Sequence, residues 1–328
     1  MRLVMMGTGL FAEPTFAAIL GSQHPVVGFF TQPDRSTGAE RGSTRQVGPG
    51  LKELARQQNV PIFQPESINT PESSELLRSL KPDLLVVAAY GQILSREVLE
   101  APTQGGINVH ASLLPRYRGA APIAWAIYRG ETESGVTIIR MSTGLDAGDM
   151  LAQEATPIGP EETAGELETR LAQIGARLGA QIVEQMGVGP VTGKQQDKSL
   201  ATKAPKLTKE LGLIDWSRNA EEIDRQIRAM QPWPTPYSYL HRSGQTPART
   251  IIYKVRRFGQ KPPGDRKPGS IRVATDAGGT LLVACGDGEM EIVELQPAGK
   301  KRMPTSSFLR GFRPQVDDWF GPEQATGN

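Results

Sequence analysis

The residues of this sequence best suited to chemistry are an amide, an imidazole and a hydroxyl spaced two residues apart. Asn108, His110 and Ser112 follow one another in this way within residues 106–112, where the positions between them are apolar. Residues two apart in an extended strand share a face, so the three polar side chains are expected to point the same way. Polar groups at the end of a buried strand need partners or a ligand. The spacing therefore predicts an active-site edge rather than a structural histidine.

A carboxylate that could orient the imidazole lies further along the chain. Asp146 stands between Gly144 and Gly148. Glycines on both sides let the chain turn tightly and present the carboxylate. An imidazole that acts as a base needs such an orienting acid. We therefore predict Asp146 as the acid that orients His110.

The secondary-structure elements that must position these residues alternate between strands and helices. Strands are expected at Leu3–Met6, Val26–Thr31, Leu84–Ala89, Gly106–His110, Gly135–Met141 and Met150–Pro157. Helices are expected at Pro14–Leu20, Leu51–Gln57, Glu72–Leu80 and Glu162–Gln185. Alternation of strands and helices is typical of an α/β fold with a predominantly parallel sheet covered by helices on both faces.

A glycine motif after the first strand admits two interpretations. Residues Gly7–Ala12 form a GxGxxA pattern, which occurs where dinucleotides bind. The acid expected at the end of the second strand is displaced to Asp34, in a loop that contains proline. We favour a tight strand-to-helix turn at the rim of the active site. A nicotinamide-dependent oxidoreductase remains the alternative.

The amino-acid composition of the sequence changes after the long predicted helix. Residues 187–208 are rich in Gly, Pro, Lys and Gln, and we interpret them as a linker. A helix is expected at Ala220–Met230, and strands at Arg249–Arg256, Gly269–Ala274, Thr280–Cys285 and Met290–Leu295. Short strands at this spacing predict a small barrel. The expected organisation is a catalytic domain at 1–186, a linker at 187–208, a barrel at 209–316 and a disordered tail at 317–328.

Composition and charge narrow the classes of function. The single cysteine, Cys285, excludes an intramolecular disulfide and a cysteine cage for metal, and no metal is expected. Residues 1–205 hold 18 Lys/Arg against 21 Asp/Glu, whereas residues 206–328 hold 19 against 14. The total of +2 thus hides a basic C-terminal half that suggests a polyanionic partner. No long apolar run or leader-like segment is evident, so a cytoplasmic protein without a membrane span is expected. A monomer is also expected.

The motifs together resemble a known family. Residues 108–115 (Asn-Val-His-Ala-Ser-Leu-Leu-Pro), 118–122 (Arg-Gly-Ala-Ala-Pro) and 145–149 (Leu-Asp-Ala-Gly-Asp) are similar to motifs of the folate-dependent formyltransferases. Residues 206–210, 214–217, 232–234 and 295–301 resemble the branch of that family that acts on aminoacylated tRNA. The resemblance covers residues 1 to about 312.

This resemblance implies a Rossmann-like formyltransferase domain followed by an OB-type barrel. The implied reaction transfers the formyl group of 10-formyltetrahydrofolate to the α-amino group of methionyl initiator tRNA, for translation initiation. By similarity, Asn108 would donate to the developing oxyanion, and His110 would move protons or stabilise the oxyanion as a cation. Asp146 would hold His110 or relay a proton to the leaving nitrogen.

The resemblance also implies binding residues. The folate is expected along Val87, Ala88, Ala89, Tyr90, Gly91, Gln92, Ser112, Leu113, Leu114 and Pro115. The tRNA is expected at Arg35, Arg41, Arg45, Lys206, Lys209, Lys254, Arg256, Arg257, Lys300, Lys301 and Arg302. Arg41 is our choice for the loop arginine, in 34–49, that reaches the acceptor end.

Two further alternatives stay open at this point. A formyltransferase acting on an amino sugar nucleotide would share the catalytic residues without needing a basic C-terminal domain. A non-catalytic RNA-binding protein would keep the barrel, but the intact set of Asn108, His110 and Asp146 argues against it.

Overall fold

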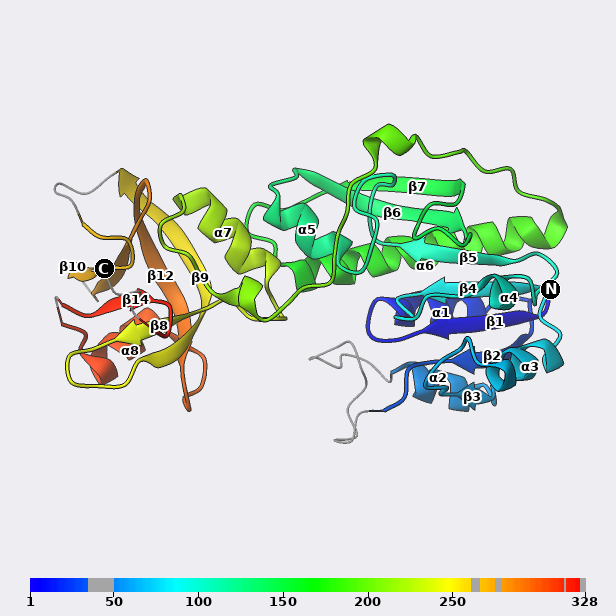
Figure 1. Cartoon of the computed structure of the whole chain (residues 1–328), viewed down its shortest axis with the longest axis horizontal. Coiled ribbons are helices and arrows are strands. Elements are labelled where there is room, and N and C mark those ends of the chain that lie inside the picture. The colour runs from blue at the N-terminus through cyan, green and yellow to red at the C-terminus, as the bar shows by residue number, and fades with distance from the viewer. Residues whose placement is uncertain (35–49, 261–265, 275–278, 316, 325–328) are drawn as a thin grey trace. The chain divides into compact units, whose positions relative to one another are not determined.

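The computed structural model of the chain describes residues 1–34, 50–260, 266–274, 279–315 and 317–324 (Figure 1). It divides into two compact units. The first comprises Met1–Ile123, Thr132–Ile158 and Glu166–Lys206. The second comprises Ala124–Glu131, Gly159–Gly165 and Leu207–Asn328. Of the residues expected as a linker, 187–208, residues 187–206 belong to the first unit and residues 207–208 to the second.

A seven-stranded sheet forms the centre of the described part of the first unit. Its order is β3 (Ile62–Phe63), β2 (Val26–Phe30), β1 (Leu3–Gly7), β4 (Leu84–Ala88), β5 (Gly106–His110), β6 (Glu133–Arg140) and β7 (Met150–Pro157). The pairings from β3 to β5 are parallel, and those of β6 with β5 and β7 are antiparallel. The predicted predominantly parallel, Rossmann-like sheet is confirmed, and it ends in an antiparallel pair.

Helices cover both faces of this sheet. On one face, Phe16 of α1 (Ala12–Leu20) packs edge-on against Phe29 with ring centroids 5.5 Å apart. On the same face, α6 (Ala164–Val188) lies so close to β5 that a Cβ on Gly175 would be 2.7 Å from Val109. On the other face, Leu77 of α3 (Pro71–Ser79) and Val98 of α4 (Arg96–Leu99) share a core with β1 and β4. These buried layers hold the carboxyl ends of β4 and β5 in place.

Of three short helices in the described chain, one was expected from the sequence and two were not. Helix α2 (Leu51–Gln57), which the sequence predicts, packs against α1 and β3. Helices α4 and α5 (Pro122–Tyr128) were not expected. Residues 122–128 read Pro-Ile-Ala-Trp-Ala-Ile-Tyr, so α5 has no polar face and lacks the helical periodicity that a sequence pattern relies on.

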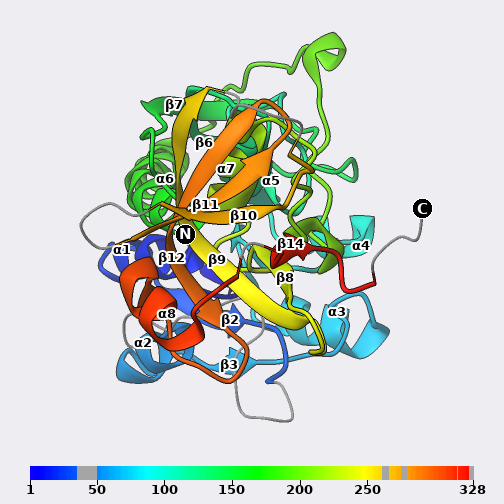
Figure 2. The ribbon, with the colours of Figure 1, turned by 90° about the vertical axis from the view of Figure 1, so that its left-hand side faces the viewer.

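An antiparallel sheet curls through the second unit (Figure 2). Its order is β10 (Ile271–Ala274), β11 (Thr280–Cys285), β12 (Gly288–Pro297), β9 (Ala248–Gln260), β8 (Tyr237–His241) and β14 (Trp319–Gly321), with β13 (Met303–Pro304) paired to β12. An isolated bridge between Ser270 and Trp319 joins the β14 edge to the start of β10. Because the two edges meet, the sheet is barrel-like, as the sequence predicts.

Two helices pack on this sheet. Helix α7 (Ala220–Ala229) begins with a capping box in which the side chain of Asn219 accepts from the Glu222 amide while Glu222 bonds back to the Asn219 amide. Helix α8 (Thr305–Phe312) contacts β11, β12 and β13. The short 3-10 turns η1 (Lys198–Leu200) and η2 (Glu210–Gly212) lie between α6 and α7.

The C-terminal segment differs from the expected disordered tail. Trp319–Gly321 form strand β14, and Trp319 stacks on His241 with ring centroids 3.9 Å apart. The carboxylate of Asp318 accepts a 3.1 Å hydrogen bond from Arg242. Both partners lie on or next to β8, far away in the sequence, so no local pattern indicates this strand.

None of the helices in the described parts of the chain combines the length and the apolar character that crossing a membrane requires.

Candidate functional site

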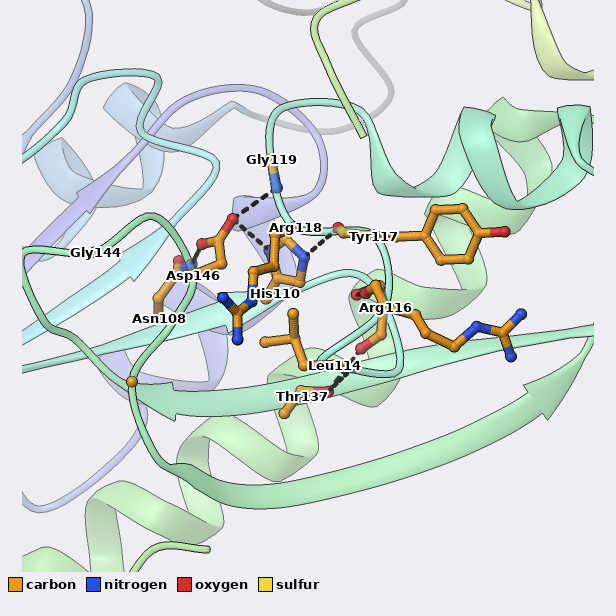
Figure 3. A network of polar contacts seen from close by, with 12 residues as sticks. Asn108, His110, Leu114, Arg116, Tyr117, Arg118, Gly119, Thr137, Gly144 and Asp146 are labelled. Carbon is orange, nitrogen blue, oxygen red and sulfur yellow. Dashed lines mark hydrogen bonds and ion pairs between the residues drawn. The ribbon is translucent and has the colours of Figure 1, made fainter. Parts of the chain in front are cut away.

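Asn108 and His110 lie on one face of β5 and meet Asp146, which comes from the loop between β6 and β7 (Figure 3). The Nδ2 of Asn108 is 3.4 Å from Oδ1 of Asp146. The Nδ1 of His110 is 3.7 Å from Oδ2 of the same carboxylate. The structure thus brings the three predicted catalytic residues together, and the expectation that Asn108 and His110 share a face is fulfilled.

The carboxylate of Asp146 is held on more than one side. The main-chain amide of Gly119 donates to Oδ2 at 2.8 Å. The side chain of Asp146 is only 11 % exposed, and its backbone takes the left-handed conformation with φ of 47°. A non-glycine residue in this region costs about 1 kcal/mol or more, so the surrounding bonds must compensate. The conformation of the loop and the Gly119 hydrogen bond therefore fix the position of the carboxylate.

The hydrogen bonds of His110 determine which ring nitrogen handles a proton. Its Nε2 lies 3.0 Å from the carbonyl oxygen of Tyr117. A carbonyl only accepts, so Nε2 carries a hydrogen and donates it. In neutral His110 the lone pair is then on Nδ1, which faces Asp146. Nδ1 is therefore the ring nitrogen whose lone pair is open to a proton, and it lies 3.7 Å from Oδ2 of Asp146.

Asn108 retains a donor for a substrate. A primary amide has two N–H groups, and only one of them points at Asp146. The other is able to donate to an oxygen that becomes negative during a reaction. An amide donor, a proton-handling imidazole and an orienting carboxylate together suit acyl transfer, in which negative charge develops on a carbonyl oxygen.

Ser112 lies beyond the end of β5 and does not join this group. It is buried, and its hydroxyl donates to the carbonyl of Arg116 at 2.7 Å. The next loop residues are fixed from β6 and β7: the Leu114 amide donates to Thr137 at 3.1 Å, and Gln153 donates to the Leu114 carbonyl at 2.9 Å. Of the four residues expected to bind folate here, Leu113 and Pro115 are partly exposed, whereas Ser112 and Leu114 are buried.

The loop that follows β4 turns its main chain outward. Ala89 and Gly91 are exposed and have positive φ angles of 47° and 80°. Val87 and Ala88 are buried in β4 and offer only backbone groups. The side chain of Gln92 points inward, where its Oε1 accepts from the Ile68 amide at 2.7 Å. A flat polar ring bound at this loop would therefore form hydrogen bonds with main-chain groups rather than with side chains.

Two residues from neighbouring strands hold the carbonyl of Tyr90. Gln32 donates to it through Nε2 at 3.0 Å, and Thr8 approaches it at 3.5 Å. The phenol of Tyr90 is buried, and no partner for it exists among the described atoms. Burial raises the pKa of this phenol well above its usual range. Tyr90 is thus an apolar anchor for its loop and not an acid.

The glycines after β1 make a tight turn at this end of the sheet. A Cβ on Gly7 would lie 2.6 Å from the carbonyl oxygen of Ala88, so the close approach of β1 to β4 requires glycine. Gly9 has a φ of 77° and precedes α1. This geometry agrees with the turn that we favoured for Gly7–Ala12.

The predicted cationic residues occupy varied environments. Arg35, Arg41 and Arg45 lie outside the described residues. Ion pairs engage three others: Lys254 with Glu161 at 2.8 Å, Arg257 with Asp287 at 3.6 Å and Arg302 with Glu294 at 2.5 Å. The remaining ones are exposed, namely Lys206, Lys209, Arg256, Lys300 and Lys301.

Sequence reasoning missed several residues that shape the site. Tyr117 and Gly119 contribute main-chain groups, and Gln196 binds the loop of Asp146. Main-chain contributions leave no signature in residue type, and Gln196 stands in a segment without periodicity. Within the described parts of the chain, no cluster of three or more His, Cys, Asp or Glu residues could hold a metal ion.

Comparison with protein families accounts for nearly all of the chain. Residues 1–183 match the model described as formyl transferase. Residues 206–313 match the model described as formyl transferase, C-terminal domain. The first match includes Asn108, His110 and Asp146.

Two relatives of similar length have the same name. A methionyl-tRNA formyltransferase of Citrifermentans bemidjiense is 44 % identical over 326 residues, covering 99 % of this chain and 98 % of the relative. A protein of the same name from Acidithiobacillus ferrooxidans is 43 % identical over 320 residues and covers 98 % of each chain.

Solved structures share the fold at lower identity. An N-formyltransferase from Helicobacter canadensis, solved with folinic acid and dTDP-3-aminofucose, has a TM-score of 0.64 at 19 % identity and covers 89 % of this chain and 98 % of that one. HypX from Aquifex aeolicus has a TM-score of 0.62 at 17 % identity, covering 97 % of this chain and 48 % of that one.

Proposed function

Because the chain belongs to the formyl transferase family, we propose that it transfers the formyl group of 10-formyltetrahydrofolate to the α-amino group of methionyl initiator tRNA. The product would be N-formylmethionyl-tRNA for translation initiation. The observation that carries the proposal is the contact of Asn108 and His110 with one carboxylate, Asp146, inside the segment that matches the family. Relatives with the tRNA-specific name match both units, and this favours tRNA over an amino sugar as the acceptor.

We propose a role for each residue of this group. The formyl donor would supply an electrophilic carbon for attack by the methionyl amine. Asn108 donates its second N–H to the formyl oxygen as negative charge develops there. His110 accepts the proton lost by the amine at Nδ1 and returns it to the leaving nitrogen. Asp146, 3.7 Å from Nδ1, stabilises the imidazolium between these two events.

The folate is proposed to lie between two loops. The exposed backbone of Ala89 and Gly91 fits a pterin that forms hydrogen bonds with main-chain groups. The partly exposed Leu113 and Pro115 would cover an apolar part of the ring system. The buried side chains expected in this set, those of Val87, Tyr90 and Ser112 among them, would support the walls from behind.

The second unit is proposed as the tRNA-binding domain, an OB-type barrel that follows the linker near residues 187–208. Its support is the basic C-terminal half together with exposed Lys300 and Lys301 beyond β12. Phosphates are bound by such cations through release of counterions. The loop at 34–49, which carries Arg35, Arg41 and Arg45, is proposed to reach the acceptor end, with Arg41 as the arginine that inserts there. We propose a cytoplasmic location, because it fits a role in translation initiation.

Formylation by the purified protein tests this function directly. We expect turnover of methionyl initiator tRNA with 10-formyltetrahydrofolate, measured by acid-urea gel separation of formylated and free aminoacyl-tRNA. Uncharged tRNA and a dTDP-amino sugar serve as matched alternative acceptors and should give no product. Turnover of the amino sugar without turnover of methionyl-tRNA would overturn the proposal.

A further inference from the structure

The segment that follows α6 is bonded along its length to the loops of the active site. Lys194 and Met150 exchange two backbone hydrogen bonds, of 2.8 and 2.9 Å. Further on, the Arg118 amide donates to the Thr202 carbonyl at 2.9 Å, and the Ala204 amide donates to the Arg118 carbonyl at 2.7 Å. We call residues 194–204 the strap. Its path makes it part of the walls of the site and not a free tether.

One side chain of the strap binds the backbone of the Asp146 loop. Gln196 is only 5 % exposed. Its Nε2 donates to the carbonyls of Asp146 at 2.8 Å and Gly148 at 2.7 Å. Its Oε1 accepts from Nε and Nη2 of Arg118 at 3.2 and 2.7 Å. Every donor and acceptor of this amide is therefore in use.

The loop that Gln196 holds requires external support. Asp146 has a positive φ, and the neighbouring Leu145 is 61 % exposed, so little apolar burial fixes this turn. Two partly buried hydrogen bonds from Gln196 to the carbonyls of Asp146 and Gly148 restrict the backbone on both sides of the carboxylate. Breaking them is costly, because the buried amide of Gln196 would be left unsatisfied.

The strap supports the imidazole side of the site as well. The hydroxyl oxygen of Thr202 accepts from the Tyr117 amide at 2.8 Å, and the Tyr117 carbonyl is the partner of His110 Nε2. A Cβ on Gly119 would lie 2.6 Å from the Ala204 carbonyl oxygen, so the strap packs directly on the residue whose amide binds Asp146. Both members of the His110–Asp146 pair thus rest on residues 194–204.

We propose that Gln196 is a positioning residue for formyl transfer, which fixes the Asp146 carboxylate relative to Nδ1 of His110. This inference rests on the proposed function. The residue touches no reacting atom itself and acts through the loop of Asp146. Displacement of a catalytic group by about 1 Å costs up to about 10²-fold in rate, which sets the size of the effect.

Two substitutions separate the donor function from packing. Gln196→Met keeps the length of the side chain and removes all four hydrogen bonds. Gln196→Glu keeps an acceptor for Arg118 but replaces the two N–H donors by a carboxylate oxygen that repels both carbonyls. Gln195→Ala is the matched control, because Gln195 is the exposed neighbour of the same residue type.

The kinetic result expected is a selective loss of kcat. Both Gln196 variants should lower kcat by about 10- to 100-fold, with KM for methionyl-tRNA and for the folate donor within about twofold of wild type. Gln195→Ala should retain wild-type values. A kcat within twofold of the control in both Gln196 variants would overturn the proposal. A rise in KM at unchanged kcat would do so too, because it would assign the strap to substrate binding.

A spectroscopic readout makes the test independent of turnover. The chain has three histidines, so ¹⁵N-histidine NMR resolves the ring nitrogens of His110 once a His110→Ala spectrum has assigned them. In Gln196→Met and Gln196→Glu the Nδ1 signal of His110 should shift, while the signals of His24 and His241 stay in place. An unchanged His110 signal contradicts the proposal. Should wild type not formylate methionyl-tRNA, the proposed function fails, and the NMR comparison still decides the role of Gln196.

Discussion

The loops around Asp146 and the cationic strands of the second unit both carry polar side chains, but they differ in how many bonds each side chain makes. In the first region Asp146, His110 and Gln196 are almost buried, and each has two or more polar partners. In the second, Lys300 and Lys301 are exposed, and the neighbouring ion pair of Arg302 with Glu294 is partly exposed. Buried polar groups set a geometry, whereas exposed charges add small, screened increments.

This difference predicts how substitutions behave in the two regions. Removal of one buried partner should change the chemistry abruptly, because the remaining groups lose their position together. Removal of one surface charge should weaken binding gradually and in a way that depends on salt.

The largest effect is expected at the imidazole. His110→Ala should lower kcat by about 10²–10⁴-fold, because it removes the proposed acceptor for the proton of the attacking amine. His241→Ala is the matched control: His241 is also buried, but it stacks on Trp319 in the second unit. The His241→Ala variant should lower the free energy of unfolding by about 1–2 kcal/mol and leave kcat unchanged. Single-turnover formylation and urea unfolding of both variants check this, and a near-wild-type kcat in His110→Ala would remove the imidazole from the chemistry.

A pair of glycines tests the contrast at the level of the backbone. Gly119→Ala should destabilise the protein by about 2 kcal/mol, because a Cβ there meets the Ala204 carbonyl at a φ of 124°. The same change should lower kcat at least about tenfold through the Asp146 carboxylate. In α8 of the second unit, a Cβ on Gly311 meets nothing within 4 Å. Gly311→Ala should therefore stabilise by up to about 1 kcal/mol without loss of activity. Equal effects of the two changes on kcat would contradict the contrast.

The smallest effect is expected at the exposed lysines. Lys300→Ala with Lys301→Ala should weaken tRNA binding by about tenfold at low salt and reduce the slope of log Kd against log salt by up to about two. Arg78→Ala with Arg96→Ala serves as the control, because it removes two exposed arginines from α3 and α4 of the first unit. Filter binding over a range of salt measures both. An unchanged slope in the lysine variant would show that tRNA binds to another surface.

Much of the catalytic region was predictable because its signals are local. Short apolar runs predicted the buried strands, and apolar residues spaced three or four apart predicted the buried face of α6. The alternation of β5 placed Asn108 and His110 on one face, and the structure agrees. The same reasoning extended the face to Ser112, but β5 ends at His110, and the hydroxyl turns to the Arg116 carbonyl instead.

The sequence by itself therefore determined the α/β class of the first unit, its main elements, the barrel-like second unit and the shared face of Asn108 and His110 on β5. These follow from periodicity and residue type over a few neighbouring positions. Only the tertiary structure decided that Gln196 holds the Asp146 loop from 50 residues away, that Nε2 of His110 donates to the Tyr117 carbonyl, and that Trp319–Gly321 closes the curled sheet. Each of these rests on hydrogen bonds or backbone pairing between distant segments, and such bonds depend on where the chain has folded rather than on the residues next to them.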